Sequence, residues 1–134
     1  MTSPPSWCGR WIGLPFEERG RGPAAFDCWG LVRAVLLEQR AVELPRYDEY
    51  ESTQDAGAVA GVVAAARPRF DRVETPAEGD LVLFRVAGNA QHVGVCVDAT
   101  WFLHARRGIG SALERWDVPT WAPRVEGFYR VVTP

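Results

Sequence analysis

The sequence predicts an α+β domain in which N-terminal helices pack on a small antiparallel β-sheet. The first half contains two stretches with helical patterns. From Gly79 on, the pattern changes to short runs of β-forming residues separated by turn residues. Helices followed by a run of short strands favour this fold class. A chain of 134 residues can bury roughly two thirds of its unfolded surface as one domain. We therefore expect a single domain over residues 1–134.

The N-terminal part, through Gly22-Pro23, predicts mostly irregular structure. A first helix is predicted from Asp27 to about Gln39, because apolar residues there recur at helical spacing. Residues 44–52 are acidic and interrupted by proline, which predicts a loop. An alanine-rich helix follows over about residues 54–66 and is ended by Pro68.

The second half predicts strands over residues 80–86, 91–97 and 101–105, with a turn at 87–90. Two more strands are predicted around residues 112–116 and 127–132. We expect these strands to form a meander with the helices on one face.

Charge and composition exclude several partners. The formal net charge is −2 and the arginines are scattered between acidic residues, so nucleic acid is not an expected partner. No segment reaches the length of a membrane span, and we expect no membrane insertion. Cys8, Cys28 and Cys96 are odd in number and irregularly spaced, which favours free thiols over a disulfide framework.

Cys28 has the setting of a nucleophile. Asp27 is a good N-cap, which places Cys28 in the first helical turn, where the helix dipole favours negative charge. The dipole supplies only about 0.3–1 kcal/mol, less than one pKa unit. A thiol attacks carbonyls as its thiolate, so a cationic partner must lower the pKa further. The chain contains only two histidines, His92 and His104, and these are the candidates.

The two histidines can act together only if they share a face of the sheet. Side chains alternate along a strand, so a shared face requires an odd number of residues, or a bulge, in the connection between the two strands. A loop centred on Asp98 would place His92 and His104 directly opposite each other, whereas a two-residue turn would separate them.

Four groups of residues together resemble a known family. They are Asp27-Cys28-x-Gly30-Leu31-Val32, Gly79-Asp80-Leu81-Val82-x-Phe84, His92-Val93-Gly94-Val95 and, twelve residues after His92, His104-Ala105. In this order and spacing, from about Trp11 to Ala105, they resemble the NlpC/P60 cell-wall cysteine peptidases.

The resemblance implies a papain-like fold and cleavage of amide bonds in peptidoglycan stem peptides, without a cofactor or metal. It implies Cys28 as nucleophile, His92 as general base and His104 as the polar residue that orients the His92 ring. The backbone N–H of Cys28, at the helix start, is an expected oxyanion donor.

Two positions depart from the family pattern. Many relatives have a tyrosine whose hydroxyl helps the oxyanion site, in a Gly-x-Pro-Tyr segment; here Gly13-Leu14-Pro15-Phe16 ends in phenylalanine. The serine that usually follows the cysteine is replaced by Trp29, which changes the expected shape of the substrate groove.

The pairing of Asp27-Cys28-Trp29-Gly30 with the upstream Trp11-Ile12-Gly13-Leu14-Pro15-Phe16 looks most like short versions encoded among bacteriophage and gene-transfer-agent tail genes. This resemblance implies tail-tip and baseplate proteins as partners, and local opening of the cell wall during DNA delivery. No export signal is recognisable at the N-terminus. We therefore expect synthesis in the cytoplasm, assembly into a tail tip, and action in the periplasm and cell wall.

Other interpretations remain open at this point. Cys28 could be a buried structural thiol, since free cysteine is often buried. Cys28, His92, His104 and Cys96 could hold zinc, although no zinc-type spacing is present. The chain could also be a structural tail-tip or baseplate component with this fold and little turnover. Packing is the favoured role for Cys96, and the role of Cys8 is undecided.

Overall fold

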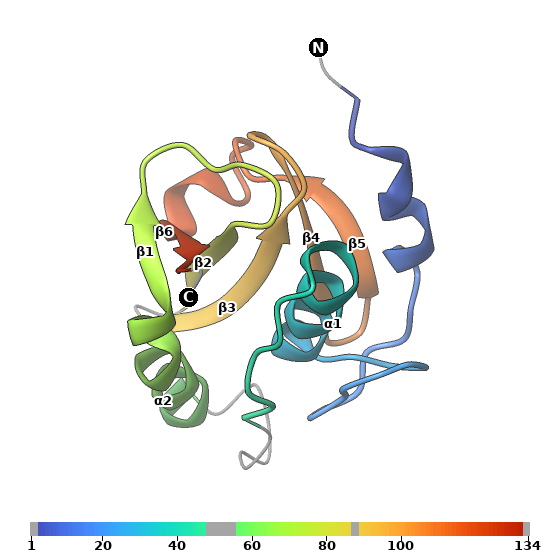
Figure 1. The fold of residues 1–134 in the computed structure, drawn as a ribbon, viewed down its shortest axis with the longest axis horizontal. Helices are drawn as coiled ribbons and strands as arrows, with labels where there is room; N and C mark the ends of the chain where they lie inside the picture. Colours follow the sequence, from blue (N-terminus) through green and yellow to red (C-terminus); the bar gives the residue numbers. More distant parts are fainter. Residues whose placement is uncertain (1–2, 48–55, 87–88, 133–134) are drawn as a thin grey trace.

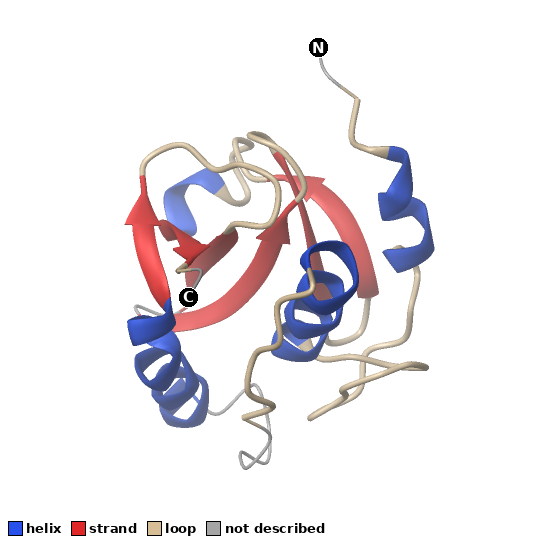
Figure 2. Cartoon of the chain, in the orientation of Figure 1, coloured by secondary structure: helices blue, strands red, loops and turns tan. Residues whose placement is uncertain are grey.

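The computed structural model describes residues 3–47, 56–86 and 89–132. Its helical elements are η1 (Ser6–Trp11), α1 (Cys28–Arg40), α2 (Ala56–Ala66), η2 (Arg67–Arg69) and η3 (Ala122–Arg124). Its strands are β1 (Phe70–Val73), β2 (Leu81–Val86), β3 (Asn89–Cys96), β4 (Trp101–Arg106), β5 (Gly110–Arg115) and β6 (Val125–Val131). The predicted α+β class is confirmed, with helices packed on an antiparallel sheet (Figures 1 and 2).

The strand order is β1-β6-β2-β3-β4-β5, with antiparallel neighbours throughout. Strands β2 to β5 form the predicted meander, but the expectation that all strands do so is wrong. The last strand, β6, pairs with β2 on the side away from β3 and then with β1, a strand that the sequence did not predict. Strand β1 is four residues long, with a half-buried residue at each end and two exposed charged residues between them. It therefore lacks the alternation that marks a strand in sequence.

Most predicted boundaries agree with the structure. Helix α1 begins at the residue after Asp27, as expected, and ends at Arg40. Strand β3 begins at Asn89, two residues earlier than predicted, so the turn is shorter than the expected 87–90. The N-terminal part, predicted as irregular, includes the short helix η1. Residues 48–55 and 87–88, which hold parts of the predicted loop, second helix and turn, lie outside the described residues.

The core consists of two clusters that belong to the two faces of the sheet. On one face, Leu81 and Leu83 of β2 and Val93 and Val95 of β3 pack against α1. Partly buried residues of α2 join the same cluster. On the other face, a smaller cluster contains Phe84, Cys96, Phe102, Phe128 and Trp121. Figure 1 shows α1 and α2 beside β3, and both helices contact that strand.

The start of α1 packs unusually close to the loop that precedes it. A Cβ atom at Gly30 would overlap the backbone carbonyl oxygen of Gly20, and the same oxygen accepts a hydrogen bond from the Asp27 N–H at 3.2 Å. Only glycine therefore allows the chain to fold back over the first turn of α1. This explains the glycine two residues after Cys28 in physical terms.

We predict that Gly30→Ala destabilises the protein by about 1–3 kcal/mol, because backbone atoms must move to remove the overlap. Gly61→Ala is the matched control, since Gly61 is exposed in α2 with no atom within 4 Å of a built Cβ. Alanine there should stabilise the helix by about 0.5–1 kcal/mol. Urea unfolding of both variants provides the measurement, and equal effects at the two positions would contradict the close approach.

Candidate active site

Asp27 fixes the position at which α1 begins. Its side chain accepts a hydrogen bond from the Gly30 N–H at 2.8 Å, in the way of a helix N-cap. The carboxylate is fully buried and forms an ion pair with Arg21 at 2.8 Å, whose side chain is only 3% exposed. Breaking a buried pair of this kind by removing one partner typically costs about 3–5 kcal/mol. The helix start is therefore held by a charge pair as well as by a cap.

The segment before α1 is tied to the helix start by backbone hydrogen bonds. Phe26 donates to the Pro15 carbonyl at 3.1 Å, and Glu17 donates to the Phe26 carbonyl at 3.2 Å. Phe16 lies opposite Phe26 in this pairing. Position 16 therefore lies beside the approach to the helix tip, and its phenylalanine side chain has no hydroxyl to offer there.

The Cys28 sulfur lies at an opening between β3 and β4. The Val97 N–H donates to the Trp101 carbonyl across these strands at 2.9 Å, and every second N–H of an antiparallel strand faces the same neighbour. The Val93 N–H therefore also points toward β4, but the pairing of these strands stops at Val95 and Leu103. The Cys28 sulfur accepts a hydrogen bond from that N–H.

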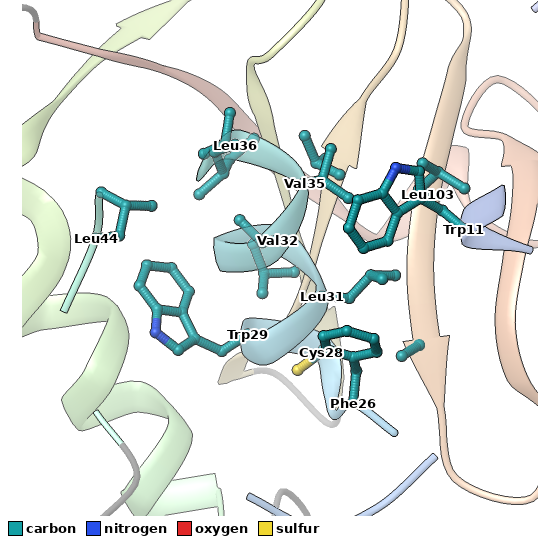
Figure 3. Packing of buried hydrophobic residues seen from close by; sticks show 14 of the residues in the cluster. Trp11, Phe26, Cys28, Trp29, Leu31, Val32, Val35, Leu36, Leu44 and Leu103 are labelled. Atoms are coloured by element: carbon teal, nitrogen blue, oxygen red, sulfur yellow. The ribbon is translucent and has the colours of Figure 1, made fainter. Parts of the chain in front are cut away.

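This contact places the sulfur beside the peptide group that joins His92 to Val93. The prediction that Cys28 faces the body of the domain is confirmed, since the residue is 3% exposed. Figure 3 shows its sulfur at the leading end of α1, near Phe26.

The resting charge state of Cys28 differs from the sequence prediction. Burial, and secondarily the charge of Asp27, raise the pKa of the Cys28 thiol to about 12, although hydrogen bonds from the backbone of Val93 and Trp29 and the charge of Arg21 act in the opposite direction. These directions are opposite to the expectation that a cationic histidine holds this thiol ionised. The Asp27 carboxylate that caps the helix also disfavours a thiolate beside it.

His92 and His104 are in direct contact on one face of the sheet. Their rings are joined by a hydrogen bond of 2.8 Å between His92 Nε2 and His104 Nδ1. The odd connection that a shared face requires is present, because three residues, 98–100, separate Val97 from its hydrogen-bond partner Trp101. The loop is centred on Ala99 and not on Asp98, so the two histidines are not directly opposed. The register places His104 across from Gly94, diagonal to His92.

Gly94 permits this close arrangement. A Cβ at position 94 would come within 2.8 Å of the Phe102 ring and 2.9 Å of the Leu103 carbonyl oxygen. The glycine of the His92-Val93-Gly94-Val95 group therefore lets β4 carry His104 against β3.

Aromatic rings surround both imidazoles. Phe84 and Trp121 stack on His92 with ring centroids 5.9 Å away, and Phe102 lies 4.5 Å from the His104 ring. Burial lowers the pKa of His92 well below its ordinary value; the repulsion that a protonated His104 would exert and the charge of Arg106 act in the same direction, and Glu114 acts in the opposite one. Burial and the charge of Arg106 lower the pKa of His104 to about 3. Both rings are therefore neutral at pH 7.

Glu114, a residue that the sequence did not indicate, completes this network together with Trp121. Glu114, on β5, accepts a hydrogen bond from His104 Nε2 at 2.5 Å through Oε2, and its other oxygen accepts from Trp121 Nε1 at 3.1 Å. Glu114 pairs with Phe102 across β4 and β5, which places it diagonal to His104. A charged residue in a strand next to the His104 strand is the only sequence signal that could have indicated it.

An apolar cavity of about 50 Å³ borders Cys28. Side chains of α1, α2 and the sheet line it, among them Trp29, Val63, Leu83 and Tyr129. Trp29 replaces the usual serine and donates its indole N–H to the Pro45 carbonyl at 2.9 Å. Figure 3 shows the Trp29 ring on the side of α1 that faces Leu44. The tryptophan thus forms one wall of the space beside the sulfur.

All three cysteines are buried free thiols, including the two that remain, Cys8 and Cys96. Cys96 is fully buried in the cluster of Phe84, Phe102 and Trp121, in agreement with the packing role, and Cys8 packs in the cluster around α1.

Within the described part of the chain, no group of three or more Cys, His, Asp or Glu side chains is arranged to hold a metal ion. In the same part, no helix has both the length and the apolarity that a membrane span requires.

The structure therefore brings His92 and His104 into contact and places Cys28 against the backbone of the next residue along β3. Contact between the sulfur and the His92 ring belongs to the mechanism proposed below.

Comparison with known proteins agrees with this geometry. Residues 13–130 match the model of the NlpC/P60 family. The chain is 29% identical to the murein DD-endopeptidase MepS/murein LD-carboxypeptidase of Escherichia coli over 92% of its own length and 58% of that protein. It is 27% identical to a probable endopeptidase NlpC homolog of Haemophilus influenzae, over 84% of this chain and 52% of that protein. It thus spans little more than half the length of these curated relatives.

Solved structures share the fold. An NLP/P60 family protein from Staphylococcus aureus aligns with a TM-score of 0.64 at 24% identity, covering 93% of this chain and 39% of that one. The NlpC/p60 domain of the peptidoglycan hydrolase SagA aligns with a TM-score of 0.58 at 20% identity, covering 94% of this chain and 92% of that one. The fold is the papain-like α+β fold of these domains, and the chain belongs to the NlpC/P60 family.

Proposed function

We propose that this chain is a thiol hydrolase that cleaves amide bonds in peptidoglycan stem peptides, with Cys28 as the nucleophile. The observation that carries the proposal is the hydrogen-bonded pair of His92 and His104. The Cys28 sulfur, at the start of α1, accepts a hydrogen bond from the N–H of Val93, the residue after His92. The curated relatives named as murein and NlpC-type endopeptidases support the substrate class.

The mechanism begins from a neutral thiol and a neutral imidazole, since both groups rest uncharged. His92 takes the thiol proton as the sulfur attacks the amide carbon, so that charge separation develops only during attack. The backbone N–H of Cys28, at the start of α1, is the expected donor to the resulting oxyanion. His92 then protonates the departing amine, and a water molecule activated by the same ring hydrolyses the thioester.

The biological setting that we propose is a phage-type tail tip, with tail-tip and baseplate proteins as partners and the cell wall as the place of action. Its support is the resemblance of Trp11-Ile12-Gly13-Leu14-Pro15-Phe16 and Asp27-Cys28-Trp29-Gly30 to short tail-encoded versions. Mass spectrometry of purified phage-like particles from the source cells should detect the chain at a fixed ratio to baseplate proteins. Its presence only outside particles would contradict this setting.

A second function, a structural component with little turnover, is favoured by specific observations. The nucleophile is 3% exposed and its pKa is raised to about 12. Position 16 lacks the hydroxyl that many relatives carry.

Digestion of purified peptidoglycan, followed by mass spectrometry of the products, distinguishes the two functions. We predict that the native protein releases new amine and carboxylate ends from stem peptides and that Cys28→Ala releases none, because the nucleophile is lost. Cys8→Ala is the matched control, since Cys8 is equally buried but lies outside the site. A native digest identical to that of Cys28→Ala would refute the enzyme and favour the structural role.

Histidine variants in the same assay test the assigned roles. His92→Ala should be as inactive as Cys28→Ala, whereas His104→Ala should keep measurable activity, because His104 only orients the base. Complete loss in both variants would count against the orienting role.

A further inference from the structure

Both carboxylate oxygens of Glu114 on β5 accept hydrogen bonds, although this side chain is 37% exposed. One oxygen accepts from His104 Nε2 at 2.5 Å and the other accepts from the indole N–H of Trp121 at 3.1 Å. An indole N–H can only donate and a carboxylate can only accept. The direction of both hydrogen bonds is therefore fixed by chemistry.

This direction propagates through the two imidazoles. Because Glu114 accepts, His104 Nε2 must carry the proton, and a neutral ring protonated there has a bare Nδ1. That bare nitrogen contacts His92 Nε2 at 2.8 Å, so His92 Nε2 must be the protonated donor. His92 Nδ1 is then left with a free lone pair, the form that a general base requires.

These proton positions exist only while both rings are neutral. His104 is fully buried, and the positive charge of Arg106 acts in the same direction as burial, so its pKa lies at about 3. If His104 were instead doubly protonated, its Nδ1 would donate to His92 Nε2, and His92 Nδ1 would carry the proton. Burial of the His104 ring among Phe102, Trp121 and His92 thus keeps it neutral, which the native tautomers require.

We propose that Glu114, held by Trp121, is a positioning residue that sets the tautomers of His104 and His92 and leaves His92 Nδ1 free as the base. This inference rests on the proposed function for its catalytic meaning, but the tautomers exist whether or not the chain turns over substrate. It extends the catalytic arrangement from β3 and β4 to β5 and to the segment before β6.

Glu114→Gln is the direct test, because glutamine keeps the shape but has only one accepting oxygen. Trp121 still donates, so the amide oxygen should face the indole and the amide NH₂ should face His104 Nε2. His104 would then be protonated at Nδ1, His92 would accept at Nε2, and His92 Nδ1 would carry the proton. We expect ¹⁵N NMR of the labelled full chain at neutral pH to show both rings in the exchanged tautomers.

The same variant should lose about 10²–10⁴-fold in kcat, as expected for a base held in the wrong tautomer. Adding Trp121→Phe removes the indole donor and frees the amide to turn its oxygen toward His104. The double variant should therefore regain the native tautomers and recover part of the lost kcat, which a merely structural role of Glu114 would not produce. Trp121→Phe alone should keep the native tautomers, because both oxygens of Glu114 can only accept.

Asp117→Asn is the control for removing a negative charge near the site, since Asp117 is exposed and pairs with Arg115. It should leave both ring spectra unchanged. Native tautomers in folded Glu114→Gln would overturn the proposal, as would exchanged tautomers that persist in the double variant. An inactive native protein with the predicted NMR pattern would refute the proposed function but not the tautomer assignment, so the two failures are distinguishable.

Discussion

The buried ion pair between Asp27 and Arg21 is the interaction on which the site depends. The Asp27 carboxylate caps α1 and so determines that the helix begins at Cys28, while Arg21 compensates a charge that would otherwise be buried alone. The close approach of Gly20 and Gly30 holds the preceding loop against the same turn. These constraints place the sulfur at the opening between β3 and β4, but the same carboxylate raises the pKa of the thiol that it positions. The carboxylate that fixes the position of the Cys28 thiol therefore also disfavours ionisation of that thiol.

The early end of the β3–β4 pairing makes the proposed catalytic arrangement possible. Cys28 belongs to the cluster on one face of the sheet, whereas the aromatic rings around His92 and His104 belong to the cluster on the other. A continuous ladder would separate the two faces. Because pairing stops at Val95 and Leu103, the Val93 N–H is available to the sulfur, and a group from the helical face reaches the strand that carries His92. Gly94 contributes by letting β4 approach β3 next to this opening.

The sequence predicted what depends on local signals. Apolar spacing and the Asp27 cap located α1 and the burial of Cys28. Strand alternation gave the condition under which His92 and His104 share a face, an odd connection, but not which connection forms. It did not predict β1 or the insertion of β6 beside β2, because β1 has an edge strand's weak pattern and the pairing joins distant segments. Glu114 was missed for a similar reason, since in sequence it is one charged residue in a half-buried strand, and only the β4–β5 register brings it to His104. The thiol pKa was predicted in the wrong direction because a positively charged histidine was expected beside Cys28, whereas burial and the Asp27 charge raise the thiol pKa and burial lowers the pKa of both histidines.

In the proposed mechanism, Cys28 rests as a neutral thiol beside a neutral His92 and loses its proton only during attack. The decisive measurement is the ultraviolet thiolate absorption of the native protein minus that of Cys28→Ala, followed as pH is raised. We expect no thiolate step from Cys28 between about pH 6 and pH 9, although a free cysteine titrates at about pH 8.5. A thiolate signal already present at pH 7 and lost in His92→Ala would contradict it and establish a preformed ion pair.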